Sequence, residues 1–316
     1  MKIVLPGGTG QIGSLLARSF QTDGHEVVVL SRDPKVEPWP TIAWDAETLG
    51  DWTNEIDGAD VVINLAGRNV NCRYTPGNQR LIMDSRVNSA RVVGEAINRS
   101  VHPPKVWLQM STATIYSHRF DAANNEHTGI IGGNELDAPA KWGFSIQVAQ
   151  NWEKAQTDAN TPDTRKVQLR TAVVMNPDPG SPFDFLTSLV RYRLGGKSGD
   201  GRQYISWIHD RDFVRAVNWL IDDESLTGPV ILAAPDPRPN AEFMRDLRAA
   251  YGVKLGLPAA KFMLTLGAWF MSSETELILK SRRVVPTRLL ESGFTFAFPD
   301  WPDAARDLCK RWRDAN

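Results

Sequence analysis

Three glycines near the start of the chain have a spacing that suits phosphate binding. In MKIVLPGGTGQIGSLLARSF, residues 1–20, an apolar run leads into Gly7, Gly10 and Gly13, and an amphipathic pattern follows. Gly7 permits a tight turn out of a strand, Gly10 lets a pyrophosphate approach the backbone, and Gly13 lets a helix pack closely on a sheet. The stretch therefore predicts the phosphate-binding loop of a dinucleotide site.

The start of the predicted helix supplies the groups that would hold the phosphates. The first backbone N–H groups of a helix, here those of residues 9–12, have no partner inside the helix. Together with the helix dipole they favour a negative charge, so Thr9, Gln11 and Ile12 are predicted to contact the dinucleotide. The alternative is an ordinary glycine-rich turn that binds nothing.

The end of the second predicted strand, residues 26–30, distinguishes between two dinucleotides. An NAD-specific site places an acidic residue there, which accepts hydrogen bonds from the ribose 2′-hydroxyl. This chain has Ser31 and Arg32 instead, and a guanidinium binds a 2′-phosphate well. NADP(H) is therefore predicted to bind in preference to NAD(H), unless Arg32 points into solvent. Asp45, after the third predicted strand, is placed to accept from the adenine amino group or to cap a helix.

Short apolar runs alternate with helix-period runs through the first half of the chain, which is typical of βαβ units. The apolar runs are continuous, as expected for a parallel sheet that is covered on both faces. The predicted strands are residues 2–5, 26–30, 42–44, 61–65, 106–110 and 166–174, and the predicted helices are 10–22, 84–99 and 145–157. The predicted fold class is α/β, with a Rossmann-type doubly wound parallel sheet.

A turn-rich stretch, residues 176–182, is predicted to separate two domains. Residues 1–175 would form the NAD(P)-binding Rossmann domain, and residues 176–316 a smaller α+β substrate-binding lobe near the carboxyl ends of the strands. The elements predicted after residue 182 are helices 183–193, 210–221 and one from Asn240, a strand 230–233, and a buried helix 257–271 that is too short to span a bilayer.

The composition excludes several classes of protein. The 316-residue chain is 42% hydrophobic, which suffices for a core, and its net charge of −1 is unlike that of a nucleic-acid binder. Only Cys72 and Cys309 are present, without the spacing of a disulfide framework or a metal site. The first predicted strand begins too early for a signal sequence. A cytoplasmic protein with a small-molecule substrate, and no membrane or nucleic-acid partner, is expected.

Several motifs resemble, in order, those of the extended short-chain dehydrogenase/reductase superfamily. GGTGQIG is similar to its phosphate loop, and VNSARVVGEAI, residues 87–97, to the helix after its fourth strand. VVINLAG, residues 61–67, resembles the segment beneath the cofactor, and this implies cofactor contacts from Leu65, Ala66 and Gly67.

Later motifs point to one branch of that superfamily. STATIY, residues 111–116, resembles the strand end that supplies a hydroxyl and an aromatic group to the active site, here Thr112 and Tyr116. GDGRQYISWIHDRDFVRA and SRRVVPTRLLESGFTFAFPD resemble an atypical epimerase-like branch, whose members carry their own C-terminal domain and are called nucleoside-diphosphate-sugar epimerases. The resemblance implies an NAD(P) cofactor and a monomer or homodimer.

The catalytic signature of the superfamily, YxxxK, is missing. The lysine normally lowers the pKa of the tyrosine, but no tyrosine here has a lysine four residues later, and Ser145 and Ala149 stand in the two positions. Thr112 and Tyr116 are therefore the predicted pair for polarisation and proton transfer. Other ionisable groups of the neighbourhood, each of which could instead be a solvated loop residue, are His118, Glu126, His127 and Lys141.

Two further departures concern the substrate. The resemblance implies an asparagine and an arginine that hold the nucleotide sugar, but Val173 and Ile205 occupy these positions. An apolar residue cannot compensate a buried phosphate charge, although Arg202 stands nearby. The predicted function is an NADP(H)-binding epimerase/dehydratase-like oxidoreductase. The alternatives are a non-catalytic NADP(H)-binding sensor or regulatory protein and a nucleotide-sugar epimerase.

Overall fold

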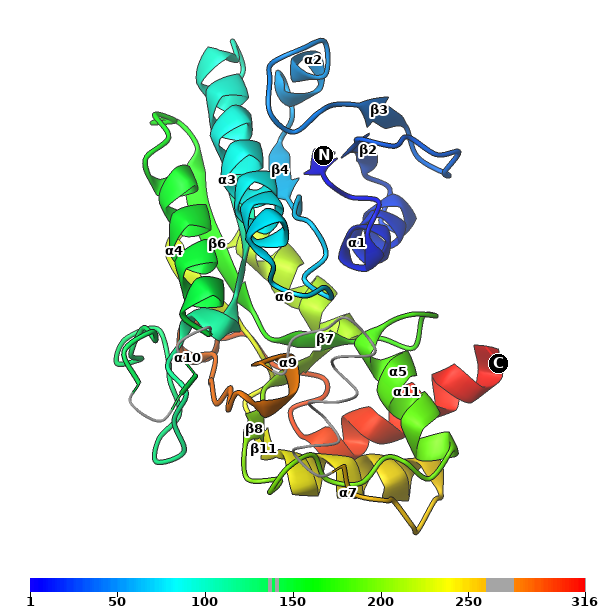
Figure 1. The fold of residues 1–316 in the computed structure, drawn as a ribbon. Helices are drawn as coiled ribbons and strands as arrows, with labels where there is room; N and C mark the ends of the chain where they lie inside the picture. Colours follow the sequence, from blue (N-terminus) through cyan, green and yellow to red (C-terminus); the bar gives the residue numbers. More distant parts are fainter. Residues whose placement is uncertain (136–137, 140–141, 260–275, 316) are drawn as a thin grey trace.

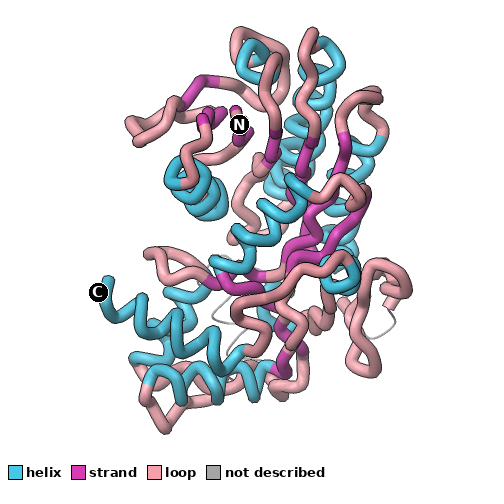
Figure 2. Tube along the Cα trace, turned by 180° about the vertical axis from the view of Figure 1, so that it is seen from behind, coloured by secondary structure: helices cyan, strands magenta, loops and turns pink. Residues whose placement is uncertain are grey.

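A seven-stranded parallel sheet forms the centre of the computed structural model, which describes residues 1–135, 138–139, 142–259 and 276–315 (Figure 1, Figure 2). The strand order is β10-β6-β5-β4-β1-β2-β3, and neighbouring strands run parallel. The prediction of a doubly wound Rossmann-type α/β fold is confirmed. The strands are β1 Lys2–Pro6, β2 Glu26–Ser31, β3 Thr41–Ala43, β4 Val61–Asn64, β5 Val106–Thr112, β6 Arg165–Thr171 and β10 Gly228–Leu232.

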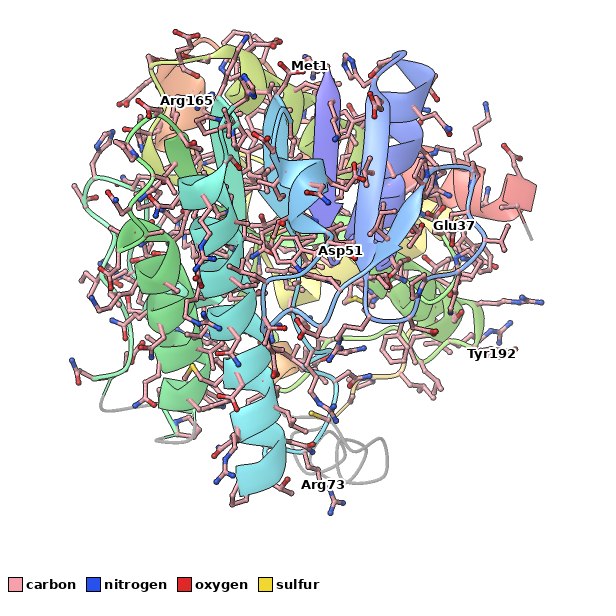
Figure 3. The ribbon with its side chains drawn as sticks, turned by 90° about the horizontal axis from the view of Figure 1, so that it is seen from above. Met1, Glu37, Asp51, Arg73, Arg165 and Tyr192 are labelled. Carbon is pink, nitrogen blue, oxygen red and sulfur yellow. The ribbon has the colours of Figure 1, made fainter. Side chains whose placement is uncertain are left out.

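Helices cover both faces of the sheet because the strands are apolar on both sides. Phe20 and Phe213 are fully buried against one face, and Trp107 on the other. Figure 3 shows α3 and α4 running side by side over the second face, with Arg73 near the start of α3. The first face carries α1 Gln11–Thr22 and α6 Asp210–Asp222, and the second carries α2 Thr53–Ile56, α3 Pro76–Arg99 and α4 Gly143–Thr157.

Helix α3 begins at Pro76, earlier than the predicted range 84–99. Proline suits the first position of a helix, where its missing N–H costs no hydrogen bond. The Thr75 hydroxyl caps this end, because it accepts a hydrogen bond from the Asn78 N–H at 3.3 Å. The prediction failed here because Thr-Pro-Gly is also typical of a turn, and the first buried residue of the helix is Ile82.

Helices from the C-terminal half form a second core beside the sheet, at the bottom of Figure 1. Trp301 stacks on Phe243 with ring centroids 3.8 Å apart. The elements of this part are α5 Pro182–Arg191, α7 Asn240–Tyr251, α11 Trp301–Ala315, and two small sheets that pair β7 Val173–Met175 with β9 Trp207–His209 and β8 Tyr204–Ile205 with β11 Arg238–Pro239. The short helices are η1 Ala113–Ile115, α9 Glu276–Leu279 and α10 Thr287–Glu291.

Two further sequence predictions differ from this arrangement. The predicted strand 166–174 is two strands, since the chain leaves the main sheet at Ala172 and β7 pairs with β9. Residues 257–259 are not helical, and Ala259 instead forms a β-bridge with Ser198. The rest of the predicted helix 257–271 lies outside the described residues.

The division into residues 1–175 and 176–316 stays a prediction. Two elements of the second range pack with the first, because β10 pairs in the main sheet and α6 covers its first face. In the described ranges, no helix combines the length and the apolar character that crossing a membrane requires.

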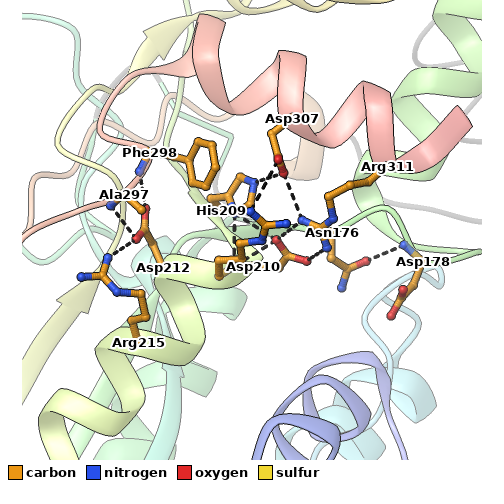
Figure 4. A network of polar contacts seen from close by, with 11 residues as sticks. Asn176, Asp178, His209, Asp210, Asp212, Arg215, Ala297, Phe298, Asp307 and Arg311 are labelled. Atoms are coloured by element: carbon orange, nitrogen blue, oxygen red, sulfur yellow. Dashed lines mark hydrogen bonds and ion pairs between the residues drawn. The ribbon is translucent and has the colours of Figure 1, made fainter. Parts of the chain in front are cut away.

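A buried polar network joins α11 to the start of α6 (Figure 4). The Arg311 guanidinium donates to both carboxylate oxygens of Asp210, at 2.8 and 2.6 Å. His209 is fully buried, with its Nδ1 3.0 Å from Asp210 and its Nε2 3.1 Å from Asp307. Burial disfavours the charge of Asp210, but the hydrogen bonds from Arg311 and His209 outweigh it and hold the pKa of Asp210 well below its usual range.

Asp210→Asn is expected to lower the free energy of unfolding by about 2 kcal/mol at neutral pH, because it removes the carboxylate charge that binds both Nη atoms of Arg311 and leaves only the longer contact of Arg311 with Asp307, at 3.3 Å. The pKa of Asp210 is lower in the folded state than in the unfolded state. The ionised Asp210 therefore stabilises the fold above pH about 4, and this contribution is lost as the pH falls. The difference between the variant and the wild type should therefore shrink in urea titrations at acid pH. Asp303→Asn, which removes an exposed ion pair with Arg306 on the same helix, is the control. A pH-independent difference would contradict the prediction.

Candidate functional site

The phosphate-loop glycines occupy positions that have no room for a side chain. Gly7 has a φ of +75°, and a Cβ there would lie 2.5 Å from Ala66 Cα. A Cβ on Gly13 would lie 2.2 Å from the carbonyl oxygen of Gly8. The turn between β1 and α1 is also closed by hydrogen bonds from the Gly7 N–H to Leu30 O at 2.8 Å and from the Gly8 N–H to Leu5 O at 3.0 Å. These contacts bring the start of α1 close to the ends of β1 and β4.

Gly10 differs from the other two glycines, because a Cβ there would meet nothing within 4 Å. Its φ of −81° suits any residue, and no side chain caps the helix that follows. Open space therefore lies in front of an uncapped helix N-terminus, which fits a phosphate group. A loop of the C-terminal half borders this place, because Gln11 Nε2 donates to Pro179 O at 3.4 Å and Arg18 forms an ion pair with Asp178.

The end of β2 lies beside the phosphate loop. Ser31 Oγ is 3.4 Å from Thr9 Oγ1 and accepts a hydrogen bond from the Asp33 N–H at 3.1 Å. The Arg32 side chain is exposed and forms no hydrogen bond or ion pair with the described part of the chain. Its guanidinium is thus available to a ligand that reaches the end of β2.

Asp45 holds its own turn together. Its Oδ1 accepts from the N–H groups of Glu47 and Thr48, both at 2.8 Å, and its Oδ2 accepts from the Thr48 hydroxyl. The hydrogen bond from the Thr48 hydroxyl lowers the pKa of Asp45. Asp45 therefore closes a turn and does not cap a helix, since the next helix begins only at Thr53, and the contact with adenine stays a prediction.

The segment after β4 lies next to the turn between β1 and α1, and its contacts with a cofactor stay a prediction. The Leu65 N–H donates to Pro6 O at 2.8 Å, and the Ala66 N–H donates to Asn64 Oδ1 at 3.1 Å. Gly67 is exposed, and Arg86 lies directly beneath it, since a Cβ on Gly67 would be 3.0 Å from Arg86 Cζ. The sequence motifs do not reveal Arg86, because its place depends on how α3 packs against the end of β4.

The structure places the two predicted catalytic side chains in different surroundings. Thr112, at the carboxyl end of β5, is partly exposed and its Oγ1 accepts from the Thr114 N–H at 3.1 Å. Tyr116 is buried, and its hydroxyl accepts a hydrogen bond from Arg170 Nη1 at 2.9 Å. Arg170 in turn pairs with Glu153 of α4 through two hydrogen bonds, of 2.9 and 2.7 Å.

Tyr116 is less acidic than the tyrosine of a YxxxK pair, whose pKa the lysine lowers. Burial raises the pKa of the Tyr116 phenol, although the charge of Arg170 partly offsets it. A higher pKa makes the phenol a poorer proton donor near neutral pH. The catalytic role of Tyr116 stays a prediction that this geometry does not favour.

The other ionisable residues of the neighbourhood connect segments of the chain. His118 Nδ1 accepts from the Ser281 N–H at 2.7 Å, and the exposed His127 lies 2.9 Å from Glu291. Glu126 accepts from the Ile231 N–H at 2.8 Å, and burial raises the pKa of its carboxyl. Lys141 lies outside the described residues.

The start of α4, where the superfamily has its tyrosine, contacts the C-terminal segment. Ser145 Oγ donates to Glu276 Oε2 at 2.7 Å, and Glu276 pairs with Lys280 at 3.6 Å. Lys280 Nζ donates to Thr114 O at 2.8 Å, next to the end of β5. Burial lowers the pKa of Lys280 to about 8, so this group can exchange a proton near neutral pH. No sequence spacing could reveal the cluster, because residues far apart in the chain form it.

The positions that hold nucleotide sugars in the superfamily are apolar. Val173 packs into the second core, and Ile205 pairs with Arg238 across two short strands. Arg238 is itself neutralised by Asp236, whose carboxylate is 2.7 Å away. Arg202 lies over the ring of Phe120 at 5.7 Å.

The chain is similar to proteins named after epimerases. The model of the NAD dependent epimerase/dehydratase family matches residues 3–232, and a domain of unknown function, DUF1731, matches residues 259–308. A relative from Staphylococcus saprophyticus, epimerase family protein SSP1921, is 31% identical, with 96% of this chain and 98% of the relative covered.

Two solved structures resemble the whole chain. The crystal structure of human epimerase family protein SDR39U1 (isoform 2) with NADPH has a TM-score of 0.85 and 26% identity, and the match covers 98% of this chain and 99% of that one. The nucleoside-diphosphate sugar epimerase from Corynebacterium glutamicum has a TM-score of 0.76 and 26% identity, and the match covers 98% of this chain and 58% of that one.

Proposed function

The chain belongs to the NAD-dependent epimerase/dehydratase family, and from this premise we propose that it is an NADP(H)-dependent oxidoreductase of epimerase/dehydratase type that acts on a small molecule. The observation that carries the proposal is the pairing of an uncapped helix start, open in front of Gly10, with the available guanidinium of Arg32. The NADPH in the structure of the human relative supports this choice of cofactor.

Each cofactor-binding residue has a distinct task in this proposal. Backbone N–H groups of residues 9–13 bind the pyrophosphate, and the Arg32 guanidinium and the Ser31 hydroxyl bind the 2′-phosphate. Leu65, Ala66 and Gly67 line the path toward the end of β5. Asp45 faces the adenine.

The reaction would take place near the carboxyl end of β5. When bound, the nicotinamide supplies or accepts a hydride. The Thr112 hydroxyl is partly exposed there and would hold the substrate oxygen by a hydrogen bond. Tyr116 would contribute a proton only if its phenol left Arg170, whereas Lys280, with a pKa of about 8, already contacts this strand end through Thr114.

Arg32→Ala is expected to weaken NADPH binding by about 1.5 kcal/mol or more, because the 2′-phosphate loses a charge-assisted hydrogen bond. NADH has no 2′-phosphate, so its affinity should change little. Isothermal titration calorimetry of the wild type and the variant with NADPH and with NADH measures both changes in affinity.

Lys35→Ala is the matched control, because it removes one positive charge from the same exposed loop. It should leave the preference for NADPH unchanged. Equal losses for NADPH and NADH in Arg32→Ala would contradict the assignment of the 2′-phosphate to Arg32.

A second candidate function is NADP(H) binding without turnover. It is favoured by Ser145 and Ala149 in the YxxxK positions and by the raised pKa of Tyr116. A panel of carbonyl and alcohol substrates, followed by NADPH absorbance, separates the two functions. Turnover would exclude the second, and NADPH binding without turnover of any compound would favour it.

A nucleotide sugar, as named for the Corynebacterium neighbour, is less well supported as a substrate. Val173 and Ile205 offer no charge or hydrogen bond to a diphosphate, and Arg238 is already paired. We therefore place the substrate among smaller compounds.

A further inference from the structure

Arg86 is a partly buried arginine on α3 that has no acidic partner. Its Nη1 donates to the carbonyl oxygens of Arg68, at 3.0 Å, and Ile82, at 3.2 Å. The guanidinium lies 5.0 Å from the ring centre of Trp152 on α4. Among the described residues, no carboxylate pairs with it, and its Nε and Nη2 donate no hydrogen bond.

Two other partly buried arginines pair with carboxylates, whereas Arg165 donates only to backbone carbonyl oxygens, as Arg86 does. Arg170 binds both oxygens of Glu153, and Arg311 binds both oxygens of Asp210. A guanidinium that is taken out of water without a carboxylate is costly, and burial lowers the pKa of Arg86 to about 10. Such a cost is expected where the missing anion comes from a ligand.

The position of Arg86 also favours an anion that comes from a ligand. Its Cζ, Nε and Nη2 lie beneath the exposed Gly67, at the carboxyl edge of β4. Ligands of open parallel sheets bind at this edge. The phosphate loop lies next to it, since Gly7 approaches Ala66 closely.

The surrounding charges also favour an anion. Lys280 and Arg282 come from the C-terminal segment, and both contact Thr114 near the end of β5. The charge of Tyr74 acts to raise the pKa of both Arg86 and Arg282. Glu276 pairs with Lys280 and, through its backbone carbonyl, accepts from Arg282, and no ion pair joins it to Arg86 among the described residues.

We propose that Arg86 binds an oxyanion of the substrate, a carboxylate or a phosphate, at the end of β4. This inference rests on the proposed oxidoreductase function and narrows its substrate to an anionic carbonyl or hydroxyl compound. The cofactor is the other possible source of the oxyanion, but its phosphates are assigned to the start of α1 and to Arg32. The guanidinium would use its Nε and Nη2 together, which suits the two oxygens of a carboxylate or phosphate.

The test titrates inorganic phosphate and acetate separately into the apoprotein and into the NADP⁺-loaded protein, by calorimetry. The variants are Arg86→Met and Arg86→Lys, and the control is Arg91→Met, which changes an exposed arginine on the same helix. The loaded wild type is expected to bind at least one of the two anions. Arg86→Met should weaken this binding about tenfold or more, Arg86→Lys about threefold, and Arg91→Met not at all. NADPH affinity should stay within about twofold in each variant.

Each other outcome contradicts the proposal in a defined way. Absence of heat with both anions in the wild type, or equal anion affinity in wild type and Arg86→Met, would overturn it. Unchanged anion binding together with a tenfold loss of NADPH affinity would assign Arg86 to a cofactor phosphate. Circular dichroism checks folding, and Arg86→Lys decides the matter if Arg86→Met does not fold. Failure of the wild type to bind NADPH would refute the proposed function, whereas the apoprotein titration would still test Arg86.

Discussion

Gly13→Ala is expected to weaken NADPH binding about a hundredfold or more and to lower the free energy of unfolding by about 2 kcal/mol. The added Cβ would lie 2.2 Å from the Gly8 carbonyl oxygen and 2.4 Å from Gly8 Cα, and both are backbone atoms that cannot rotate away. The start of α1 must therefore move away from the end of β1. This displacement separates the N–H groups of the helix start from the turn that aims them at the phosphates.

Gly10→Ala tests whether NADPH affinity can fall while the free energy of unfolding stays nearly unchanged. A Cβ there meets nothing within 4 Å, so the free energy of unfolding should change by less than about 1 kcal/mol. NADPH affinity should nevertheless fall, because the methyl group occupies the space in front of the helix. Gly77→Ala, in open space on α3, should change neither quantity appreciably. NADPH affinity that is equal to wild type in both Gly10→Ala and Gly13→Ala would contradict the phosphate site.

The sequence predicts the phosphate loop and the order of the elements because the relevant signals are local. Gly7 needs a positive φ and Gly13 a close contact, and both requirements act over a few residues. The parallel sheet also follows from short continuous apolar runs, since each run is buried on both faces. The start of α3 at Pro76 was missed, although proline before an apolar helix is a known start signal.

The chemistry near the end of β5 could not be predicted in the same way. Tyr116 lies in the expected motif, but its environment is decided by Arg170 on β6 and Glu153 on α4. The contact between Ser145 and Glu276 joins residues that no pattern of spacing connects. Burial and long-range pairing decide pKa values, so the motif alone gives the place of a side chain and not its acidity.

The C-terminal segment is attached to the loops that follow β5. The Ser281 N–H donates to His118, and the Thr287 N–H donates to Glu126 at 3.1 Å. Lys280 contacts Thr114 in the same region. The segment that matches the domain of unknown function thus supplies side chains near the end of β5 as well as the first part of α11 in the second core. Its residues should be examined together with those of the Rossmann sheet when a substrate is sought.

Glu153→Gln is expected to lower the free energy of unfolding by about 3 kcal/mol or more, because it removes the only charge that compensates Arg170 among the described residues. The side chains of Arg170 and Glu153 are 11% and 12% exposed, so water can replace the lost carboxylate only in part. Glu153 Oε1 also accepts from the Ser111 hydroxyl at 2.6 Å, on the strand that ends at Thr112. The loss should be measured by urea denaturation.

The matched control for this prediction is Glu95→Gln, which breaks exposed pairs with Arg91 and Arg99 on α3 and should cost less than about 0.5 kcal/mol. The double variant Glu153→Gln/Arg170→Met should recover part of the stability, because no unpaired charge remains in the interior. A loss below about 1 kcal/mol in Glu153→Gln would mean that water reaches Arg170. Tyr116 would then also be accessible, and the argument against its catalytic role would no longer hold.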